Sequence, residues 1–378
     1  MSEITEKEAQ CFLQSLKCFD NVALYRLRTH FQSYVNAATA LEDEYEGVLK
    51  PIEISKLVSF REQKGIQTAL ADLIKRKISY FTPDDAEYPA NLRLIPDAPP
   101  AIYVLGKLPD PNIPAVAIIG ARNCSSYGRD MACQYATELA KNGIQIISGM
   151  ARGIDGIAEN SALQVGGYSC GVLGCGVDVC YPPDNRTLYD RSIEEGGIIS
   201  EYAPGTRPLA YRFPARNRII SGLADALLVI EAREKSGTLI TVSMALEQGR
   251  DIYALPGRVS DSLSYGCNLL IRDGAMPLLR PEDFVKEFME THHFAPLECS
   301  DTSVSGAVAT ISPHIRARLT RDEQLILDAL DYNPKTISEI FASIATRSNM
   351  TIPVLMQNLT GLTIKGVCQM VDGGNYSL

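Results

Sequence analysis

The sequence lacks the features that would place a protein in a membrane or outside the cell. None of its apolar runs approaches the roughly 20 residues that a transmembrane helix needs. Residues 1–8 are acidic, whereas a secretory signal is basic and then apolar. The ten cysteines form no CxxC pair, which favours reduced thiols over a disulfide framework. We therefore expect a cytoplasmic protein that contacts no membrane.

Histidine is also scarce, and this bears on catalysis. The four histidines lie outside the part of the chain expected to form a sheet, so no Ser–His or Cys–His catalytic pair is indicated. Cys170, Cys175 and Cys180 are spaced five residues apart. A zinc site would need a fourth ligand and usually a closer spacing. Buried thiols are the favoured interpretation, and no metal site is predicted.

Basic residues are outnumbered by acidic ones, 36 against 45, which gives a formal net charge of −9. Such a charge argues against non-specific binding of a polyanion. One stretch reverses the balance, because no acidic residue lies between Glu201 and Asp225. That stretch contains Arg207, Arg212, Arg216 and Arg218. Since arginine suits planar contacts with phosphate and stacking on bases, a local arginine-lined cleft remains compatible with an acidic chain.

What the sequence does contain is an alternation of short apolar runs with helical patterns, as in the βαβ units of a parallel sheet. Apolar spacing predicts short helices over residues 1–80, and the seven prolines of 81–113 predict an extended connector. A helix is expected over 128–142. Strands are expected at 115–119, 144–147, 169–173, 198–200, 226–230, 251–254 and 275–278. We predict an α/β fold whose parallel-sheet core occupies residues 81–290.

The last part of the chain has a different organisation. Residues 291–319 are rich in Ser, Thr and Ala with little periodicity, which predicts a linker. Thr320 and Glu323 then have the spacing of a capping box, and helical segments follow near 337–345 and 351–359. Gly373-Gly374 indicates a hairpin turn. Three helices and a hairpin predict a winged helix-turn-helix over 320–378.

Two glycine-rich loops follow consecutive expected strands. In an open parallel sheet, ligands bind beyond the carboxyl ends of the strands, where glycines let backbone N–H groups approach an anion and helix N-termini supply positive charge. An arginine in each loop adds charge-assisted hydrogen bonds. Each loop on its own is as consistent with a structural turn as with an anion site. The two loops together favour an anion site. The candidate residues are Gly120, Arg122, Ser125, Ser126 and Gly128 in the first loop, and Ser148, Gly149, Arg152 and Gly153 in the second.

A third candidate element combines an aromatic residue with arginines. Stacking on Phe213 and pairing of phosphates with arginine would suit a single-stranded nucleic acid. The alternative is that Phe213 lies in the core and the arginines bridge to acidic neighbours. The residues concerned are Arg212, Phe213, Arg216, Asn217 and Arg218.

A fourth loop ends in Ser236, Gly237 and Thr238 at an expected helix start. Capping of that helix by the two hydroxyls is the favoured interpretation, with donation to a phosphate as the alternative. Asp155 could act as a general base, but a carboxylate in the first turn of a helix more often complements the helix dipole.

These motifs occur in an order that resembles the bacterial DNA-processing protein A (DprA/Smf) family. The resemblance covers residues 81–290, and it is looser at both ends. It rests on Gly120-Ala-Arg, Ser148-Gly-Met-Ala-Arg-Gly-Ile-Asp, Tyr181-Pro-Pro-Asp-Asn, Phe213-Pro-Ala-Arg-Asn-Arg, Ser236-Gly-Thr-Leu-Ile-Thr and Leu255-Pro-Gly.

The resemblance implies an extended Rossmann-like core that binds single-stranded DNA, flanked by a SAM-like helical domain and a winged helix. It further implies a homodimer without catalytic activity or cofactor that protects incoming DNA during natural transformation (competence) and helps to load the RecA recombinase. The site carried over comprises Arg122 with its glycine loop, Ser148, Gly149, Arg152, Arg212, Phe213, Arg216 and Arg218, with Phe213 stacking on a base.

This chain departs from the family pattern at Glu159, where the family often has His. If Glu159 faced the cleft, its charge would weaken DNA binding. The expected recognition helix at 351–360 contains no Lys or Arg, which predicts a protein contact at least as much as a DNA groove contact. The N-terminal segment lacks the glycine-rich hairpin of DNA-contacting helix-hairpin-helix motifs, so DNA binding is not expected there.

Two other functions remain open from the sequence. Rossmann-type phosphoribohydrolases, which split nucleoside monophosphates, carry a catalytic Glu within three residues of a Gly-Thr pair. Here Thr238 is followed by Leu239, Ile240 and Thr241, so no group is placed to assist the leaving sugar. A nucleotide-binding sensor, in which the same loops hold a small phosphate ligand, is the other alternative.

Overall fold

The computed structural model describes residues 3–292, 319–330, 335–344, 350–364, 368–371 and 375–377. The chain divides into two compact units, Met1–Glu298 and Cys299–Leu378, and each is described by itself. Most of the linker expected at 291–319 lies outside the described residues. Within the described chain, no helix combines the length and the apolar character that a membrane span requires.

A nine-stranded sheet forms the centre of the first unit, in the order β1-β2-β6-β5-β4-β3-β7-β8-β9. The strands from β3 to β9 are parallel, whereas β2 is antiparallel to β6 and β1 to β2. This confirms the predicted α/β class. The bounds are β1 (Ser79–Phe81), β2 (Ile102–Gly106), β3 (Ala115–Ile119), β4 (Gln145–Ser148), β5 (Ser169–Val172), β6 (Gly197–Ser200), β7 (Ala226–Val229), β8 (Asp251–Ala254) and β9 (Met276–Pro277).

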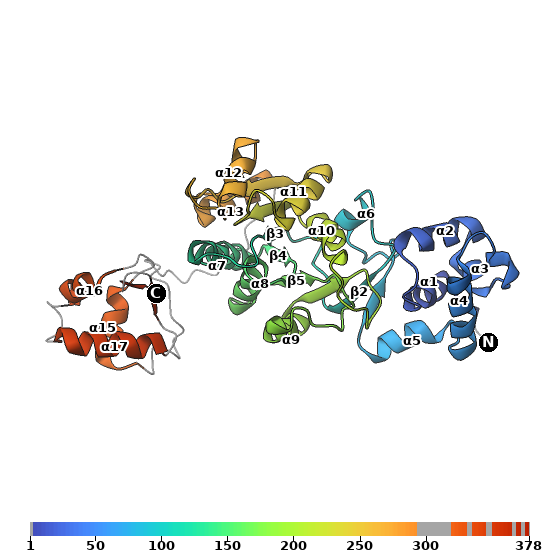
Figure 1. The fold of residues 1–378 in the computed structure, drawn as a ribbon, viewed down its shortest axis with the longest axis horizontal. Helices are drawn as coiled ribbons and strands as arrows, with labels where there is room; N and C mark the ends of the chain where they lie inside the picture. Colours follow the sequence, from blue (N-terminus) through green and yellow to red (C-terminus); the bar gives the residue numbers. More distant parts are fainter. Residues whose placement is uncertain are drawn as a thin grey trace. The chain divides into compact units, whose positions relative to one another are not determined.

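Helices cover both faces of this sheet (Figure 1). One face packs against α7 (Ser126–Lys141), α8 (Ile154–Gln164) and α13 (Pro281–Thr291), with α9 (Arg186–Glu195) beside them against β5 and β6. The other face packs against α6 (Ala90–Arg93), α10 (Arg212–Leu223), α11 (Gly237–Glu247) and α12 (Tyr265–Arg272). The central strand β3 is buried on both faces, because Val116 and Ile118 join the first layer while Ala117 and Ile119 join the second. An uninterrupted apolar run is what such a strand requires.

Helix α7 shows how local sequence determines an element that carries part of the site. Ser125 caps its start, because the hydroxyl accepts a hydrogen bond from Gly128 N at 3.0 Å. Tyr135 and Leu139 lie on its buried face. The helix ends before Gly143, whose φ of +77° a residue with a side chain adopts at a cost. The helix predicted over 128–142 is confirmed.

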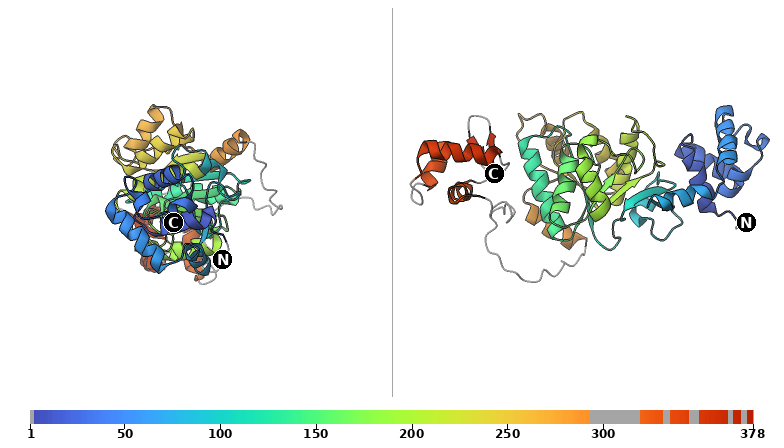
Figure 2. Two further views of the ribbon diagram at one scale, coloured as in Figure 1. Left: turned by 90° about the vertical axis from the view of Figure 1, so that its right-hand side faces the viewer. Right: turned by 90° about the horizontal axis from the view of Figure 1, so that it is seen from below.

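In the described part of the chain, five α-helices and one short 3-10 helix precede the sheet: α1 (Glu6–Ser15), α2 (Asn21–Phe31), α3 (Tyr34–Thr39), η1 (Asp43–Tyr45), α4 (Pro51–Gln63) and α5 (Thr68–Lys75). They surround a core that includes Phe12 and Leu57, and this core continues without interruption to Tyr80 and Tyr103 of the β1–β2 edge. Tyr80 also donates a hydrogen bond to Gln14 Oε1 at 2.7 Å. Figure 2 shows these helices against that edge of the sheet. The boundary at residue 80 remains a prediction, and the structure places both sides of it in one compact unit.

The second unit contains α15 (Arg321–Ala329), α16 (Ile337–Ile344), α17 (Ile352–Ile364) and the antiparallel pair β10 (Gln369–Val371) and β11 (Asn375–Ser377). The capping box of Thr320 and Glu323 is present, with both hydrogen bonds formed. Ile326, Ile340 and Leu359 lie in its core. The winged-helix assignment itself remains a prediction.

Candidate nucleic-acid interface

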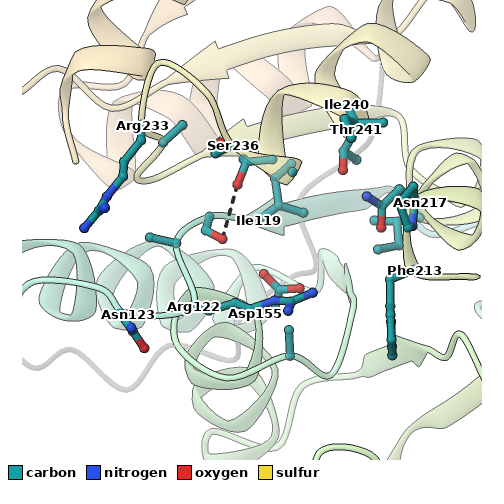
Figure 3. Close-up of a pocket in the computed structure, with 18 of the residues that line it drawn as sticks. Ile119, Arg122, Asn123, Asp155, Phe213, Asn217, Arg233, Ser236, Ile240 and Thr241 are labelled. Carbon is teal, nitrogen blue, oxygen red and sulfur yellow. Dashed lines mark hydrogen bonds between the residues drawn. The ribbon is translucent and has the colours of Figure 1, made fainter. Parts of the chain in front are cut away.

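A cavity of about 500 Å³ lies at the carboxyl ends of the central strands. The chain moves from β3 through β4 and β5 to one side of the sheet, and then returns to place β7 on the other side of β3. The loops after β3 and β7 therefore separate at this point, which is where open α/β sheets bind ligands. The cavity is lined by these two loops, by residues after β4 and by the start of α10 (Figure 3).

The structure brings together predicted residues from separate loops. These residues come from the loop after β3, the start of α10 and the start of α11. The predicted residues that line the cavity are Gly120, Arg122, Phe213, Arg216, Asn217, Ser236, Gly237 and Thr238.

Arg122 and Phe213 form the exposed part of the cavity wall. The Cζ atom of Arg122 lies 5.8 Å from the centroid of the Phe213 ring. Arg122 is exposed, and among the described residues it has no carboxylate within 4.0 Å. Its guanidinium is therefore available to a phosphate, and arginine pairs with phosphate through two parallel hydrogen bonds.

Phe213 stacks on Tyr181, a residue outside the glycine-rich loops and the arginine-rich segment predicted from the sequence. The two rings stack with their centroids 5.3 Å apart and an interplanar angle of 29°. Tyr181 is 39% exposed, so the pair is a surface platform and not part of the core. Gly174 makes room for it, because a Cβ atom there would lie 3.0 Å from the Phe213 ring. The only sequence signal for Tyr181 was its place in one of the motifs.

The N-terminus of α11 faces the cavity and is not capped. Ser236, at the N-cap position, makes no side-chain cap hydrogen bond, and its Oγ atom is buried with no partner among the described residues. Thr238 Oγ1 instead donates to Gly120 O at 3.4 Å. The capping role favoured from the sequence is therefore not what the structure shows. An uncapped helix start directs free N–H groups and positive partial charge into the cavity.

Below this surface, Arg216 belongs to a buried group of charges. Its Nη1 atom donates to Gly149 O at 2.7 Å and to Val172 O, which ties α10 to the ends of β4 and β5. Asp155 is buried beside it and lines the cavity floor. Burial raises the pKa of Asp155 to about 6, although Arg216 and hydrogen bonds from the backbone of Gly120 and Gly149 oppose the increase. Arg216 therefore supplies charge that Asp155 partly compensates.

Glu159 lies beneath this group and does not face the cavity. Its side chain is completely buried, and Oε1 accepts a hydrogen bond from Met150 N at 3.2 Å. Burial raises its pKa well above the ordinary range, and the neighbouring Asp155 raises it further. Glu159 was expected to weaken DNA binding only if it faced the cleft, and the structure shows that it does not.

The structure differs from the expectation at the N-terminus of α7. The carboxylate of Glu231, which follows β7, accepts hydrogen bonds from Ser125 N at 3.0 Å and Ser125 Oγ at 2.5 Å. It also fills the space beside Gly128, where a Cβ atom would lie 2.3 Å from the carboxyl carbon. Glu231 thus occupies the place expected for a phosphate. We leave Ser125, Ser126 and Gly128 out of the site, and none of them lines the cavity.

Three further predicted residues have structural partners. Ser148 is fully buried and donates to Ile118 O at 2.6 Å. Gly149 provides space under the Asp155 and Arg216 side chains, which would lie within 2.8 Å of an added Cβ atom. Arg218 is buried and pairs with Glu201 through both terminal nitrogens, at 2.9 and 2.8 Å. For Arg218, the alternative of an arginine bridging to an acidic neighbour is the one that the structure shows.

Arg212 and Arg152 do not line the cavity. Arg212 covers the rings of Tyr202 and Tyr211, at 4.9 and 5.5 Å from their centroids. Arg152 and Gly153 line a second hollow of about 870 Å³, of which Arg122 also forms part of the wall. Eight of the predicted residues thus line one cavity, and Arg152 and Arg212 lie outside it.

The cavity offers little for the hydrolysis of a nucleotide. Asp155 is the one carboxylic acid among the residues that line it, and Ile240 and Thr241 occupy the positions where a hydrolase would carry Glu. The described chain also contains no group of three or more His, Cys, Asp or Glu side chains arranged for a metal ion.

Comparison with known proteins places this architecture in a family. The family model of DNA recombination-mediator protein A matches residues 79–289. The chain is 40% identical to protein Smf of Synechocystis over 68% of its own length and 66% of that protein. It is 35% identical to protein Smf of Escherichia coli over 86% of its length and 84% of that protein.

Two solved structures agree with this assignment. The X-ray structure of DNA processing protein A from Streptococcus pneumoniae superposes with a TM-score of 0.64 at 34% identity, over 76% of this chain and 99% of that one. A structure describing the single-stranded DNA binding mode of DNA processing protein A from Helicobacter pylori gives a TM-score of 0.51 at 29% identity, over 57% and 97% of the two chains. The chain belongs to the DNA recombination-mediator protein A family, that of the DprA and Smf DNA-processing proteins.

Proposed function

We propose that this DNA-processing protein binds single-stranded DNA in the cavity between the β3 and β7 loops, without catalysing a reaction. The observation that carries the proposal is the convergence of three features around one cavity: Arg122, which forms no ion pair with the described residues, the uncapped α11 N-terminus and the Phe213–Tyr181 platform. Guanidinium and helix N–H groups bind phosphates, and the rings stack on unpaired bases. The single-stranded DNA binding of the Helicobacter pylori relative supports the same ligand.

Arg122→Ala tests the site. We expect it to weaken binding of a labelled oligonucleotide of roughly 16 nucleotides about tenfold in fluorescence anisotropy, because a charged hydrogen-bonded contact contributes ~1.5–3 kcal/mol. The negative slope of log affinity against log salt should also become shallower by roughly 0.7, the value for one phosphate contact in a single strand. Arg26→Ala is the matched control, since Arg26 is exposed on α2 and lines no described cavity. Equal affinity of wild type and Arg122→Ala would refute the site.

The mononucleotide alternatives are decided in the same assay. A nucleotide sensor would bind a mononucleotide about as well as an oligonucleotide, whereas the proposed function requires the oligonucleotide to bind far more tightly. Incubation with AMP should release no adenine, because no carboxylate takes the place of a catalytic Glu after Thr238.

We infer further that the chain acts in the cytoplasm as a homodimer that protects single strands and loads the RecA recombinase during DNA uptake. Membership of a family of recombination mediators supports this role. The expected result is faster RecA assembly, seen as DNA-dependent ATP hydrolysis on single strands that are coated beforehand with a single-strand-binding protein. If Arg122→Ala no longer speeds up RecA assembly, the loading activity depends on DNA binding in the cavity.

A further inference from the structure

The second hollow lies on the other side of the β3–α7 loop from the central cavity. One of its arginines, Arg152, forms an ion pair with an acidic residue of the same chain. Arg122 and Asn123 line both this hollow and the central cavity, so the two share a wall. Arg129 and Arg152 are the other basic residues of the hollow. Two acidic residues, Asp130 and Asp184, also line it, so its three arginines outnumber the acidic residues by one. A strand held at Arg122 therefore has a moderately basic surface next to it on which its following phosphates can lie.

Arg152 is paired across this hollow with Asp184. Its Nη2 atom lies 2.5 Å from Asp184 Oδ2, and both side chains are 60% exposed. Asp184 lies in the short helix η2 (Pro183–Asn185) before α9. The neighbouring Asn185 fixes that segment, because its Nδ2 atom donates to Met150 O at 2.8 Å and to Ala151 O at 3.1 Å. The carboxylate is thus held opposite the arginine by the fold.

An exposed pair of this kind is weak and exchangeable. Ion pairs in solvent contribute little to stability, so a phosphate can displace the carboxylate at small cost. The displaced carboxylate nevertheless stays in the hollow and repels the phosphate that replaces it. Asp184 is therefore suited to lower the affinity of the hollow for DNA without abolishing it.

We propose that single-stranded DNA continues from the central cavity into this hollow, where its phosphate at Arg152 competes with Asp184 as a built-in restraint on affinity. This inference rests on the proposed function, because it extends the same binding site. The restraint acts only on strands long enough to reach past Arg122. Its removal should tighten the binding of long strands while leaving short ones unchanged.

The test compares Asp184→Asn, Arg152→Ala and the double variant on oligonucleotides of roughly 4 and roughly 16 nucleotides, over a range of salt concentrations. Asp184→Asn should bind the longer strand about threefold to fivefold more tightly, with a salt slope steeper by roughly 0.7. Arg152→Ala should weaken it, and Asp184→Asn should have no effect in the Arg152→Ala background. The short strand should bind equally well to all of these variants.

Asp190→Asn is the matched control. Asp190 forms a similar exposed pair with Arg186 at 2.8 Å, but neither residue lines the hollow. Thermal unfolding of each variant shows whether the fold is retained. Unchanged affinity of Asp184→Asn for the longer strand, or the same gain without Arg152, overturns the inference.

The two proposals fail in different ways. If the wild type binds no single strands, the proposed function fails and the inference falls with it. If the wild type binds them and Arg122→Ala reduces binding, but the Asp184 and Arg152 variants behave as wild type, the central cavity stands and only the extension is refuted.

Discussion

At the scale of single residues, Asp155 is the side chain whose charge state bears most directly on the cavity. It lines the floor, and burial raises its pKa to about 6. The charged groups nearest to it are Arg216, Arg122 and the buried Glu159. Above pH 6 its carboxylate opposes the binding of a phosphate, and below pH 6 the neutral carboxyl does not.

We therefore predict that affinity for single-stranded DNA rises by roughly threefold to tenfold as the pH falls from 7.5 through about 6. Asp155→Asn should bind at pH 7.5 as the wild type does at acidic pH, and its affinity should vary much less with pH. Oligonucleotide anisotropy at constant ionic strength measures both. A wild-type profile that is flat across this range would contradict the prediction.

The same shift has a consequence for folding. Because the pKa of Asp155 is higher in the folded protein than its ordinary value of 3.8, the folded state binds the proton more tightly than the unfolded state. The contribution of Asp155 to stability is therefore fully present below pH 4 and is lost as the pH rises through about 6.

At the scale of elements, helix α10 combines two arginines with different tasks. Arg216 reaches the cavity, whereas Arg218, two residues later, is anchored to Glu201 on the far side of the helix. The side chains of Arg218 and Glu201 are 7% and 3% exposed. Removal of one member of such a buried pair leaves an uncompensated charge.

Arg218→Ala is accordingly expected to lower the free energy of unfolding by ~3 kcal/mol in chemical denaturation. The matched control is Arg272→Ala, because Arg272 pairs with Asp273 at 2.8 Å in an exposed position, where we expect no measurable change in the unfolding free energy. Equal unfolding free energies of the two variants would show that the Arg218 pair is not structural.

The elements also show how much of the fold can be predicted from the sequence. Apolar runs predicted the strands 115–119 and 251–254 to the residue, because buried parallel strands require such runs. Strands β1 and β2 were missed, since three- to five-residue strands that pair across a proline-rich segment leave little local pattern. The carboxylate at the start of α7 could not be predicted, because Ser125 and Glu231 are 106 residues apart and only the fold brings them together.

At the scale of the whole molecule, the core of the N-terminal helices continues into the sheet edge. Tyr80 and Tyr103 are buried at the junction, and Arg76 and Asp178 form an ion pair across it. The helices therefore cover apolar surface at this edge of the sheet. Exposure of that surface to water would cost free energy.

A chain that starts at residue 79 should consequently unfold at a lower temperature than the full chain and bind more of a hydrophobic dye. Differential scanning calorimetry and dye fluorescence measure these effects. If the shortened chain has the same melting temperature and dye binding as the full chain, residues 1–78 are an independent domain.

The carboxylate of Glu231 has one more consequence. Of the two helices that follow the adjacent strands β3 and β7, α7 has its start neutralised by Glu231, whereas no side chain of the described residues caps the start of α11. The two helix starts therefore differ in the positive partial charge that they present to a nucleic acid. We expect a phosphate to bind at the start of α11 and not at that of α7. Glu231 would thus determine at which of the two helix starts the phosphate binds.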